Sequence, residues 1–157
     1  PIVRARPFTH FGPRQPATFV IASFAQQIAR IEAGKVPPIL QVGNLQARRD
    51  FLPVEDVVAA YMVLAEQGTP GEAYNIGSGH ARSIQSILDL LLTLTTASIS
   101  VSQDPTRLRS VDIPLLEADI SRIRAQTSWE PAVPFEVALQ HTLEYWRMMV
   151  TTEEVAF

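Results

Sequence analysis

Short apolar segments alternate with amphipathic ones along this chain, and that alternation constrains its fold more than any other feature. Apolar residues at helical spacing predict a helix over residues 18–33, which Gly34 ends in the C-terminal capping position. Further helices are predicted over residues 56–67, from Ser83 as a cap through residue 92, after Asp119 as a cap, and over residues 135–148. Strands are predicted over residues 2–8, 39–42, 50–54, 73–76 and 99–102. Strands that alternate with helices are typical of an α/β fold, and the lack of a linker or repeat within the 157 residues predicts a single unit.

The composition excludes several classes of protein. Hydrophobic residues make up 46% of the chain and charged residues 18%, which excludes a disordered or low-complexity protein. A formal net charge of −3 provides no basic field for nucleic acid or a membrane surface, and no apolar run is long enough to cross a bilayer. The absence of cysteine excludes disulfides, thiolate catalysis and cysteine-based zinc sites, so a reducing cytoplasm is the expected compartment. The chain opens with Pro1-Ile2-Val3, without an initiator methionine or a signal pattern, which predicts a fragment of a longer protein.

Common catalytic and cofactor motifs are missing from the sequence. The three histidines have no metal-ligand spacing, so no metal site is expected. No serine stands in a Gly-x-Ser-x-Gly turn. A dinucleotide fingerprint of the form Gly-x-Gly-x-x-Gly would begin at Gly77-x-Gly79, but Arg82 occupies the position of its third glycine. The residues alone therefore predict no catalytic group and no tightly bound cofactor on this chain.

Six segments resemble, in the same order, motifs of the extended short-chain dehydrogenases that act on nucleotide sugars (the NAD-dependent epimerase/dehydratase family). They span nearly the whole chain, at residues 6–15, 42–45, 49–58, 74–79, 104–112 and 129–131. The first reads Arg-Pro-Phe-Thr-His-Phe-Gly-Pro-Arg-Gln, and the third reads Arg-Asp-Phe-Leu-Pro-Val-Glu-Asp-Val-Val. The resemblance implies an α/β fold that forms the C-terminal portion of a Rossmann-type dehydrogenase.

Within this family the chain is most similar to the GDP-mannose branch, which comprises GDP-mannose 4,6-dehydratases and GDP-4-keto-6-deoxymannose reductases. The run over residues 26–34 and the Gly43-Asn44-Leu45 turn carry this similarity, and residues 109–114 favour a reductase. The resemblance implies a whole enzyme that transfers a hydride at the 4-position of a GDP-linked sugar with NADP or NAD. The implied small-molecule partner is therefore a GDP-sugar.

Enzymes of this family carry a glycine-rich turn and a catalytic Tyr-x-x-x-Lys in an N-terminal Rossmann half. The only lysine here is Lys35, and Ile31 stands four residues before it. The resemblance therefore implies the substrate-binding C-terminal part, inactive by itself, with the cofactor bound mainly by the absent half. Residues 1–15 and 50–79 are expected to pack on that half, and their unpaired strand edges predict association with it or with a second copy. The alternative is a non-catalytic ligand-binding or interaction module that reuses the fold.

The resemblance assigns substrate contacts to five residues. Arg49 and Arg109 match family arginines that bind the substrate diphosphate, for which two guanidinium forks are suited. Asp112 is expected to hold Arg109 or to accept hydrogen bonds from guanine or ribose. Asn44 lies at a turn where its amide reaches the base or sugar, although turn geometry alone also explains an asparagine there. Thr9 takes the place of the family's asparagine near the reacting sugar.

Two residues on the loop after the first strand are candidates for cofactor contact. His10 and Arg14 are expected to approach the cofactor or the sugar, with local turn packing as the alternative. Arg48 and Arg107 are interpreted as solvated neighbours of the two clamping arginines.

The apolar stripe at residues 19, 24 and 28 is interpreted as core, since helical spacing of apolar residues is typical of a buried face. Val20 or Ser23, on the same segment, is expected at the mouth of the pocket. Asp56 is interpreted as a helix cap, and Trp129 and Trp146 as packing residues.

Overall fold

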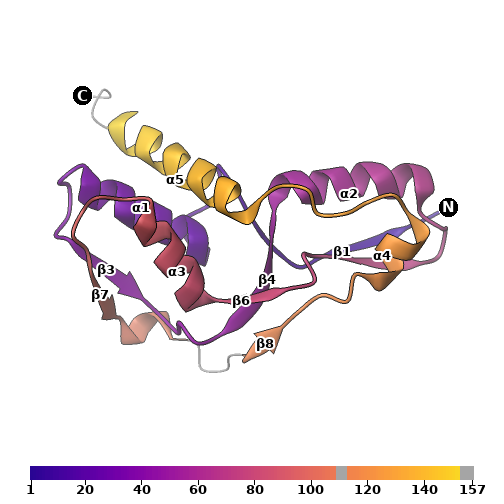
Figure 1. Ribbon diagram of the computed structural model, residues 1–157, viewed down its shortest axis with the longest axis horizontal. Coiled ribbons are helices and arrows are strands. Elements are labelled where there is room, and N and C mark those ends of the chain that lie inside the picture. Colours follow the sequence, from indigo (N-terminus) through magenta and orange to yellow (C-terminus); the bar gives the residue numbers. More distant parts are fainter. Residues whose placement is uncertain (109–112, 153–157) are drawn as a thin grey trace.

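The computed structural model describes residues 1–108 and 113–152, and it shows an elongated molecule with a packed cluster at each end (Figure 1). One end is built from the helices α1 (Val20–Glu32), α3 (Ile84–Thr93) and α5 (Phe135–Thr152). The other is built from α2 (Val54–Gln67) and α4 (Ser121–Gln126). Short strands run through both ends and across the waist between them.

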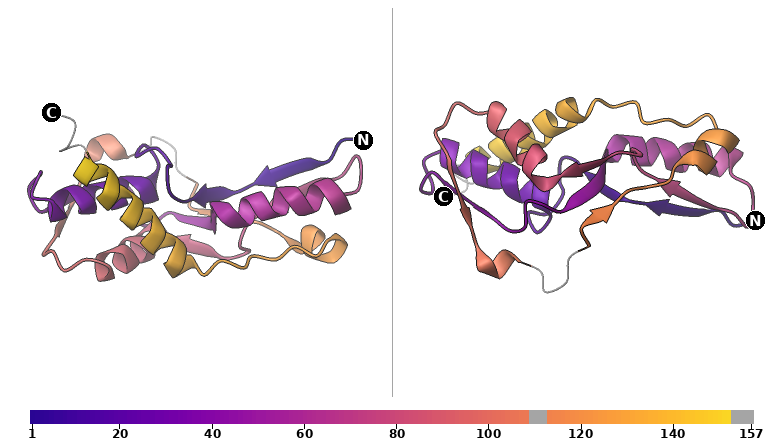
Figure 2. Two further views of the ribbon diagram at one scale, coloured as in Figure 1. Left: turned by 90° about the horizontal axis from the view of Figure 1, so that it is seen from above. Right: turned by 60° about the horizontal axis from the view of Figure 1, so that its bottom comes forward.

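The larger hydrophobic core lies at the three-helix end. α1 packs on α5 and on α3, and Figure 2 shows α5 crossing over α1 when the molecule is seen from above. Beside the helices, β3 (Ile39–Val42) pairs in parallel with β7 (Ser100–Gln103). Burial of each aliphatic side chain stabilises the fold by roughly 1.5–3 kcal/mol. The fully buried residues of this core include Ile28, Leu40, Leu88 and Leu139.

The second core lies under α2. β1 (Arg4–Pro7) pairs in parallel with β5 (Ala73–Ile76), and α2 packs along this two-stranded sheet. Apolar residues of α2 at helical spacing meet the buried side of β5. The buried residues at this contact are Val57, Ala60, Leu64, Tyr74 and Ile76.

The strand β4 (Arg48–Pro53) crosses the waist and joins the two ends (Figure 1). It pairs in parallel with β2 (Thr9–Phe11) and with β8 (Leu115–Leu116), and antiparallel with β6 (Ala81–Ser83). The second half of β4 is buried from Asp50 to Pro53, whereas Arg48 and Arg49 at its start are accessible. The last four residues of β4 therefore lie in the interior, and its first two residues lie at the surface.

The carboxylate of Asp50 fastens β4 to two loops. Asp50 is 1% exposed, and its Oδ1 accepts hydrogen bonds from the backbone N–H and the hydroxyl of Ser78, both at 2.7 Å. Its Oδ2 accepts from the N–H of Gly79 at 2.9 Å and of Ala118 at 3.2 Å. Backbone donors from both loops thus converge on one buried side chain beside Arg49.

The predicted elements are largely present, with differences at their boundaries. The strands at residues 39–42 and 73–76 lie where they are expected, and Ser83 caps α3 by accepting from the N–H of Ser86. The strand predicted over residues 2–8 is present as β1, whereas β2, which pairs in a separate sheet, was not predicted. The strands β6 and β8 were not predicted, since two or three residues carry no readable periodicity.

Two predicted helix caps are also wrong. Asp56 lies inside the first turn of α2 and is buried, and its carboxylate accepts hydrogen bonds from the backbone N–H groups of Ala132 and Val133. It therefore ties α2 to the segment that leads into α5. Asp119 stands one residue too early to be the N-cap of α4, although its Oδ1 accepts from the N–H of Ser121 at 2.9 Å.

Candidate functional site

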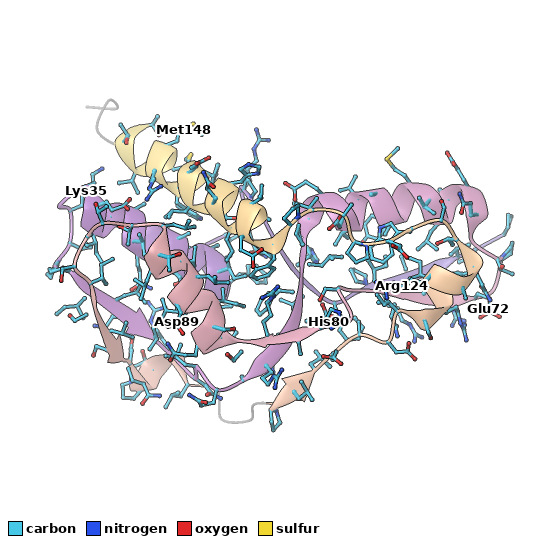
Figure 3. The ribbon with its side chains drawn as sticks, viewed as in Figure 1. Lys35, Glu72, His80, Asp89, Arg124 and Met148 are labelled. Atoms are coloured by element: carbon cyan, nitrogen blue, oxygen red, sulfur yellow. The ribbon has the colours of Figure 1, made fainter. Side chains whose placement is uncertain are left out.

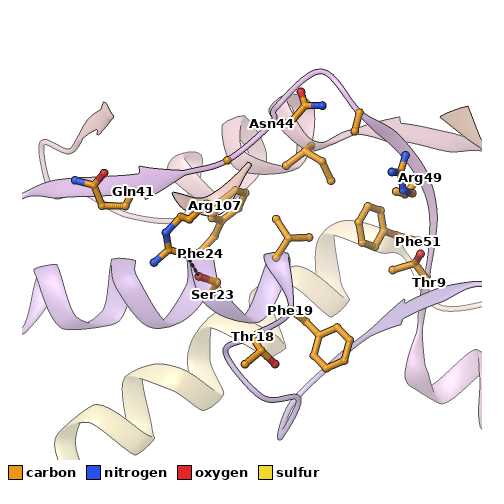
Figure 4. Close-up of a pocket in the computed structure, with 14 residues that line it drawn as sticks. Thr9, Thr18, Phe19, Ser23, Phe24, Gln41, Asn44, Arg49, Phe51 and Arg107 are labelled. Carbon is orange, nitrogen blue, oxygen red and sulfur yellow. Dashed lines mark hydrogen bonds between the residues drawn. The ribbon is translucent and has the colours of Figure 1, made fainter. Parts of the chain in front are cut away.

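A cavity of about 470 Å³ opens at the N-terminal end of α1 (Figure 4). Its walls come from α1, β2, the β3–β4 connection, the start of β4, and the 3-10 turn η1 (Pro105–Arg107). Pockets for small organic ligands have volumes of roughly 300–1,000 Å³. Figure 4 places Arg49 and Arg107 at opposite ends of this cavity, so an occupant meets a guanidinium at each end.

Arg49 and Thr9 lie together at one end of the cavity (Figure 4). The parallel pairing of β2 with β4 sets Thr9 opposite Phe51, which brings the threonine hydroxyl to the strand that carries Arg49. The Nη1 of Arg49 donates to the carbonyl of Arg48 at 2.8 Å. Two of the residues predicted to contact substrate are therefore neighbours in the fold, although 40 residues separate them along the chain.

Asn44 lines the same cavity from the turn between β3 and β4. Its Oδ1 accepts a hydrogen bond from the N–H of Gln46 at 2.9 Å, which is the geometry of an Asx turn. The preceding residue, Gly43, passes very close to η1, because a Cβ built there would lie 2.6 Å from the carbonyl oxygen of Arg107. Asn44 stands in a turn, as expected, although its φ is not left-handed, and the same turn borders the cavity.

Arg107 is exposed, as its interpretation as a solvated neighbour predicts, but it also lines the cavity, which was not expected. Its Nη1 donates to the hydroxyl of Ser23 at 3.3 Å (Figure 4), and its Nε lies 3.4 Å from Oδ2 of Asp104. Ser23 is 8% exposed and belongs to α1, so the arginine reaches across from η1 to the helix that forms the opposite wall. The expected place of Ser23 at the pocket is confirmed.

The turn that carries Arg107 is held by Asp104. Its Oδ1 accepts from the N–H of Thr106 at 2.9 Å and from the Thr106 hydroxyl at 2.7 Å. These two hydrogen bonds, with a smaller contribution from the Arg107 charge, lower the pKa of Asp104 below its ordinary value. The sequence contains a signal for this turn, because an aspartate cap followed by Pro105 at the first helical position is a typical start of a helical turn.

A half-buried amide fixes β3 against α1 beneath this end of the cavity. The Oε1 of Gln27 accepts from the N–H of Gln41 at 2.8 Å, and its Nε2 donates to the Gln41 carbonyl at 3.2 Å. The same Nε2 lies 3.3 Å from the Ser23 hydroxyl. The side chain that receives Arg107 is therefore itself held by the helix and the strand.

The apolar wall of the cavity includes part of the stripe that was interpreted as core. Phe24 is 2% exposed and Ile28 is fully buried, which confirms that interpretation for these two residues. Phe19 is 51% exposed and borders the cavity, so for this residue the interpretation is wrong. Because α1 begins at Val20, Phe19 stands at the N-cap, before the buried residues of the helix begin at Ile21.

A second hollow of about 500 Å³ adjoins the first, and the two share Thr9 and Phe19. It is lined by Phe8, His10 and Gln15 among others, and the Nδ1 of His10 lies 3.0 Å from the carbonyl oxygen of Phe8. The candidate His10 therefore lies next to Thr9 and faces a hollow. Arg14 is exposed on the following turn with a φ of 69°, and it lines neither of these two cavities.

The remaining predicted contacts, Arg109 and Asp112, lie outside the described residues. Within residues 1–108 and 113–152, no cluster of three histidine, aspartate or glutamate side chains is placed to hold a metal ion. In the same part of the chain, every helix is too short or too polar to span a membrane.

Comparison with known proteins assigns the chain to a family. The family model for GDP-mannose 4,6 dehydratase matches residues 1–142. The chain belongs to the GDP-mannose 4,6-dehydratase family. Over 152 residues it is 36% identical to GDP-6-deoxy-D-mannose reductase of Pseudomonas aeruginosa, an alignment that covers 97% of this chain and 50% of the reductase. It is 25% identical over 148 residues to the human GDP-mannose 4,6 dehydratase, covering 82% of this chain and 39% of that protein.

Solved structures of related enzymes share its fold. The structure of RMD from Pseudomonas aeruginosa in complex with NADPH superposes with a TM-score of 0.88 at 35% identity, over 94% of this chain and 48% of that one. A UDP-glucose 4-epimerase of Thermotoga maritima, with UDP-glucose, gives a TM-score of 0.78 at 27% identity over 94% of this chain and 46% of that one. The chain spans about half the length of the relatives that it matches. The expected fold, the C-terminal portion of an epimerase/dehydratase-type enzyme, is thereby confirmed.

Proposed function

We propose that this chain forms the nucleotide-sugar-binding part of an NAD(P)-dependent GDP-sugar enzyme, and that the favoured reaction of the whole enzyme is the reduction of GDP-4-keto-6-deoxymannose. The observation that carries the proposal is the cavity with a guanidinium at each end, Arg49 on β4 and Arg107 on η1. The 36% identity to GDP-6-deoxy-D-mannose reductase supports the choice of substrate and reaction.

The cavity suits a nucleoside diphosphate for physical reasons. An arginine fork donates two parallel hydrogen bonds to a phosphate, so Arg49 provides charge and orientation at once. The buried ring of Phe24 and the side chain of Val20 give an apolar wall for a base or ribose. Binding energy gathered on the nucleotide then positions the sugar at a reacting centre some distance away. Thr9, which both cavities share, is the proposed contact to that sugar.

NADP or NAD is the cofactor of the whole enzyme in this proposal, and it supplies the hydride. The second hollow supports a contact between this chain and one end of the cofactor, because the edges of Phe8 and Phe19 and the imidazole of His10 suit a flat heteroaromatic ring. Its lining contains no arginine or lysine for a pyrophosphate. His10 is accordingly proposed as a minor cofactor contact, with most of the cofactor held elsewhere, whereas a contact from Arg14 rests on the family resemblance alone.

We further propose that residues 1–15 and 50–79 pack on the Rossmann half of the whole enzyme. The two-stranded sheet of β1 and β5 supports this, because parallel strands occur almost only in larger sheets covered on both faces. Arg4, Ala5 and Arg6 of β1 are exposed in the chain alone. An accessible strand edge of this kind pairs readily with another sheet or with a second copy.

Calorimetric titration tests the nucleotide site directly. The wild-type chain is titrated with GDP-mannose and with UDP-glucose, beside Arg49→Ala and the matched control Arg124→Ala. Arg124 is exposed on α4, at the far end of the molecule from the cavity (Figure 3). We expect selective binding of GDP-mannose, weakened about 10- to 100-fold by Arg49→Ala, as for loss of a charge-assisted contact of roughly 1.5–3 kcal/mol, and unchanged by Arg124→Ala. A folded wild-type chain that binds neither ligand, or equal losses in both variants, would refute the proposal.

A further inference from the structure

The two cavities arrange three chemical environments in a fixed order. The second hollow, with His10, adjoins Thr9 and Arg49, and Arg107 stands at the opposite end of the first cavity. If the sugar lies beside Thr9 and the diphosphate beside Arg49, the base of a nucleotide extends towards Arg107. This assignment rests on the proposed function, since it starts from a nucleoside diphosphate bound at Arg49.

The guanidinium of Arg107 is oriented before any ligand arrives. Its Nη1 donates to Ser23 at 3.3 Å and its Nε lies 3.4 Å from the carboxylate of Asp104. Across residues 1–108 and 113–152, Nη2 donates no hydrogen bond. The side chain is 43% exposed, so Nη2 and the second hydrogen of Nη1 form a fork that is accessible to a ligand.

The charge around Arg107 suits a neutral base better than a phosphate. Asp104 touches the same guanidinium, and its carboxylate offsets much of the positive charge. A diphosphate brought to this end would meet that carboxylate as a second negative group. A neutral base with two adjacent hydrogen-bond acceptors on one edge can accept from both donors of the guanidinium fork and adds no negative charge.

We propose that Arg107 selects guanine, by donating two hydrogen bonds to O6 and N7 of the base, and that Ser23 and Asp104 are the positioning residues that hold its fork. Guanine presents O6 and N7 side by side as acceptors, whereas adenine presents the N6 amino donor in place of O6. A guanidinium therefore attracts guanine and opposes adenine at the same place. Uracil offers a single carbonyl on the corresponding edge.

The test compares four nucleoside diphosphates on the full 157-residue chain by calorimetry: GDP, inosine diphosphate, ADP and UDP. Inosine keeps O6 and N7 but lacks the 2-amino group of guanine, so it isolates the edge assigned to Arg107. We expect GDP and inosine diphosphate to bind about 10- to 100-fold more tightly than ADP, the range for one bidentate arginine–guanine contact. Arg107→Lys keeps the charge and loses the fork, so it is expected to reduce this preference to within about threefold.

Three variants separate the roles of the residues. Arg49→Ala is expected to weaken the binding of all four nucleotides in parallel, because it removes a diphosphate contact and leaves the base preference intact. Ser23→Ala is expected to lower the GDP-to-ADP preference partly, since Arg107 keeps its charge but loses its anchor on α1. Arg124→Ala serves as the control for removal of an exposed arginine.

Each contrary outcome has a distinct meaning. If Arg107→Lys and Arg107→Ala weaken GDP, ADP and UDP equally, Arg107 contacts the diphosphate and the inference is overturned. If the wild-type chain prefers GDP and both variants keep that preference, another group selects the base and the inference is again overturned. If the folded wild-type chain binds no nucleoside diphosphate, both the proposed function and the inference about Arg107 are refuted. Circular dichroism of each variant confirms that the compared chains are folded.

Discussion

The buried carboxylate of Asp50 is expected to be among the most sensitive single positions of the fold. It is 1% exposed and accepts four hydrogen bonds, from the N–H and hydroxyl of Ser78 and from the N–H groups of Gly79 and Ala118. Asp50→Ala removes the acceptor for three backbone donors, of which the N–H of Ala118 is buried and those of Ser78 and Gly79 are half-buried. The Ser78 hydroxyl retains a partner, because its single proton can turn from Asp50 to the carbonyl oxygen of His80, which lies 3.0 Å away.

The magnitude follows from those three donors. An unsatisfied buried polar group costs about 1–3 kcal/mol, and water that enters the vacated space recovers part of this, so Asp50→Ala is expected to cost about 3–5 kcal/mol of unfolding free energy. Asp50→Asn keeps one acceptor oxygen but turns an amide N–H₂ towards the donors of the other oxygen, and we expect a loss of about 2–4 kcal/mol. Gly77 leaves little room for rearrangement, since a Cβ there would already lie 2.7 Å from Oδ2 of Asp50.

Urea unfolding followed by far-ultraviolet circular dichroism measures these differences. Asp89→Asn is the matched control, because Asp89 is exposed on α3 and its carboxylate accepts from Gln85 on the same helix (Figure 3). A surface change of this kind is expected to stay within about 0.5 kcal/mol. If Asp50→Asn proves as mild as Asp89→Asn with the same denaturant slope, the reasoning from buried donors is wrong.

Two further predictions concern the ends of the molecule. Arg147 forms a two-pronged ion pair with Glu32, at 2.8 and 2.7 Å, and its hydrogen bonds are the main reason why the pKa of Glu32 is lowered below its ordinary value of 4.5. A lowered pKa in the folded state gives stability that is present above pH 4.5 and is lost as the pH falls through the folded value, so Glu32→Gln is expected to cost about 0.5–1 kcal/mol at pH 7 and less at pH 3. An equal cost in urea unfolding at both pH values would contradict this. The exposed edge of β1 predicts that the chain alone self-associates, which light scattering over a concentration series measures; a monomer at every concentration refutes it.

Local periodicity predicted the helices and the longer strands because these features repeat within a few residues. Ser83 was readable as a cap, since its hydroxyl accepts from a residue only three positions further on. The strands β6 and β8 could not be predicted from the sequence, because each pairs with β4, which lies about thirty or more residues away in the chain.

Cavity residues that lie in a family motif could be predicted from the sequence. Residues whose placement depends on a contact between distant parts of the chain could not. Arg49, Thr9 and Asn44 were all expected at the substrate site, and they line one cavity. The place of Arg107 at the cavity was missed because its contact with Ser23 spans 84 positions, and nothing in the neighbouring sequence indicates that contact. Asp56 was misread for the same reason, since its acceptor role towards Ala132 spans 76 positions.

The two ends of the cavity belong to different parts of the fold. The end at Arg107 is formed by α1, β3 and η1, whose positions are fixed by the three-helix core and by the Gln27–Gln41 hydrogen bonds. The end at Arg49 lies at the waist, where β2 and β4 meet and where the second hollow begins. In the proposed binding mode, base recognition therefore depends on groups that the core of this chain holds in place, and positioning of the sugar depends on the boundary with the second hollow. For this reason nucleoside diphosphates, which lack the sugar, are the most direct probes of the chain alone.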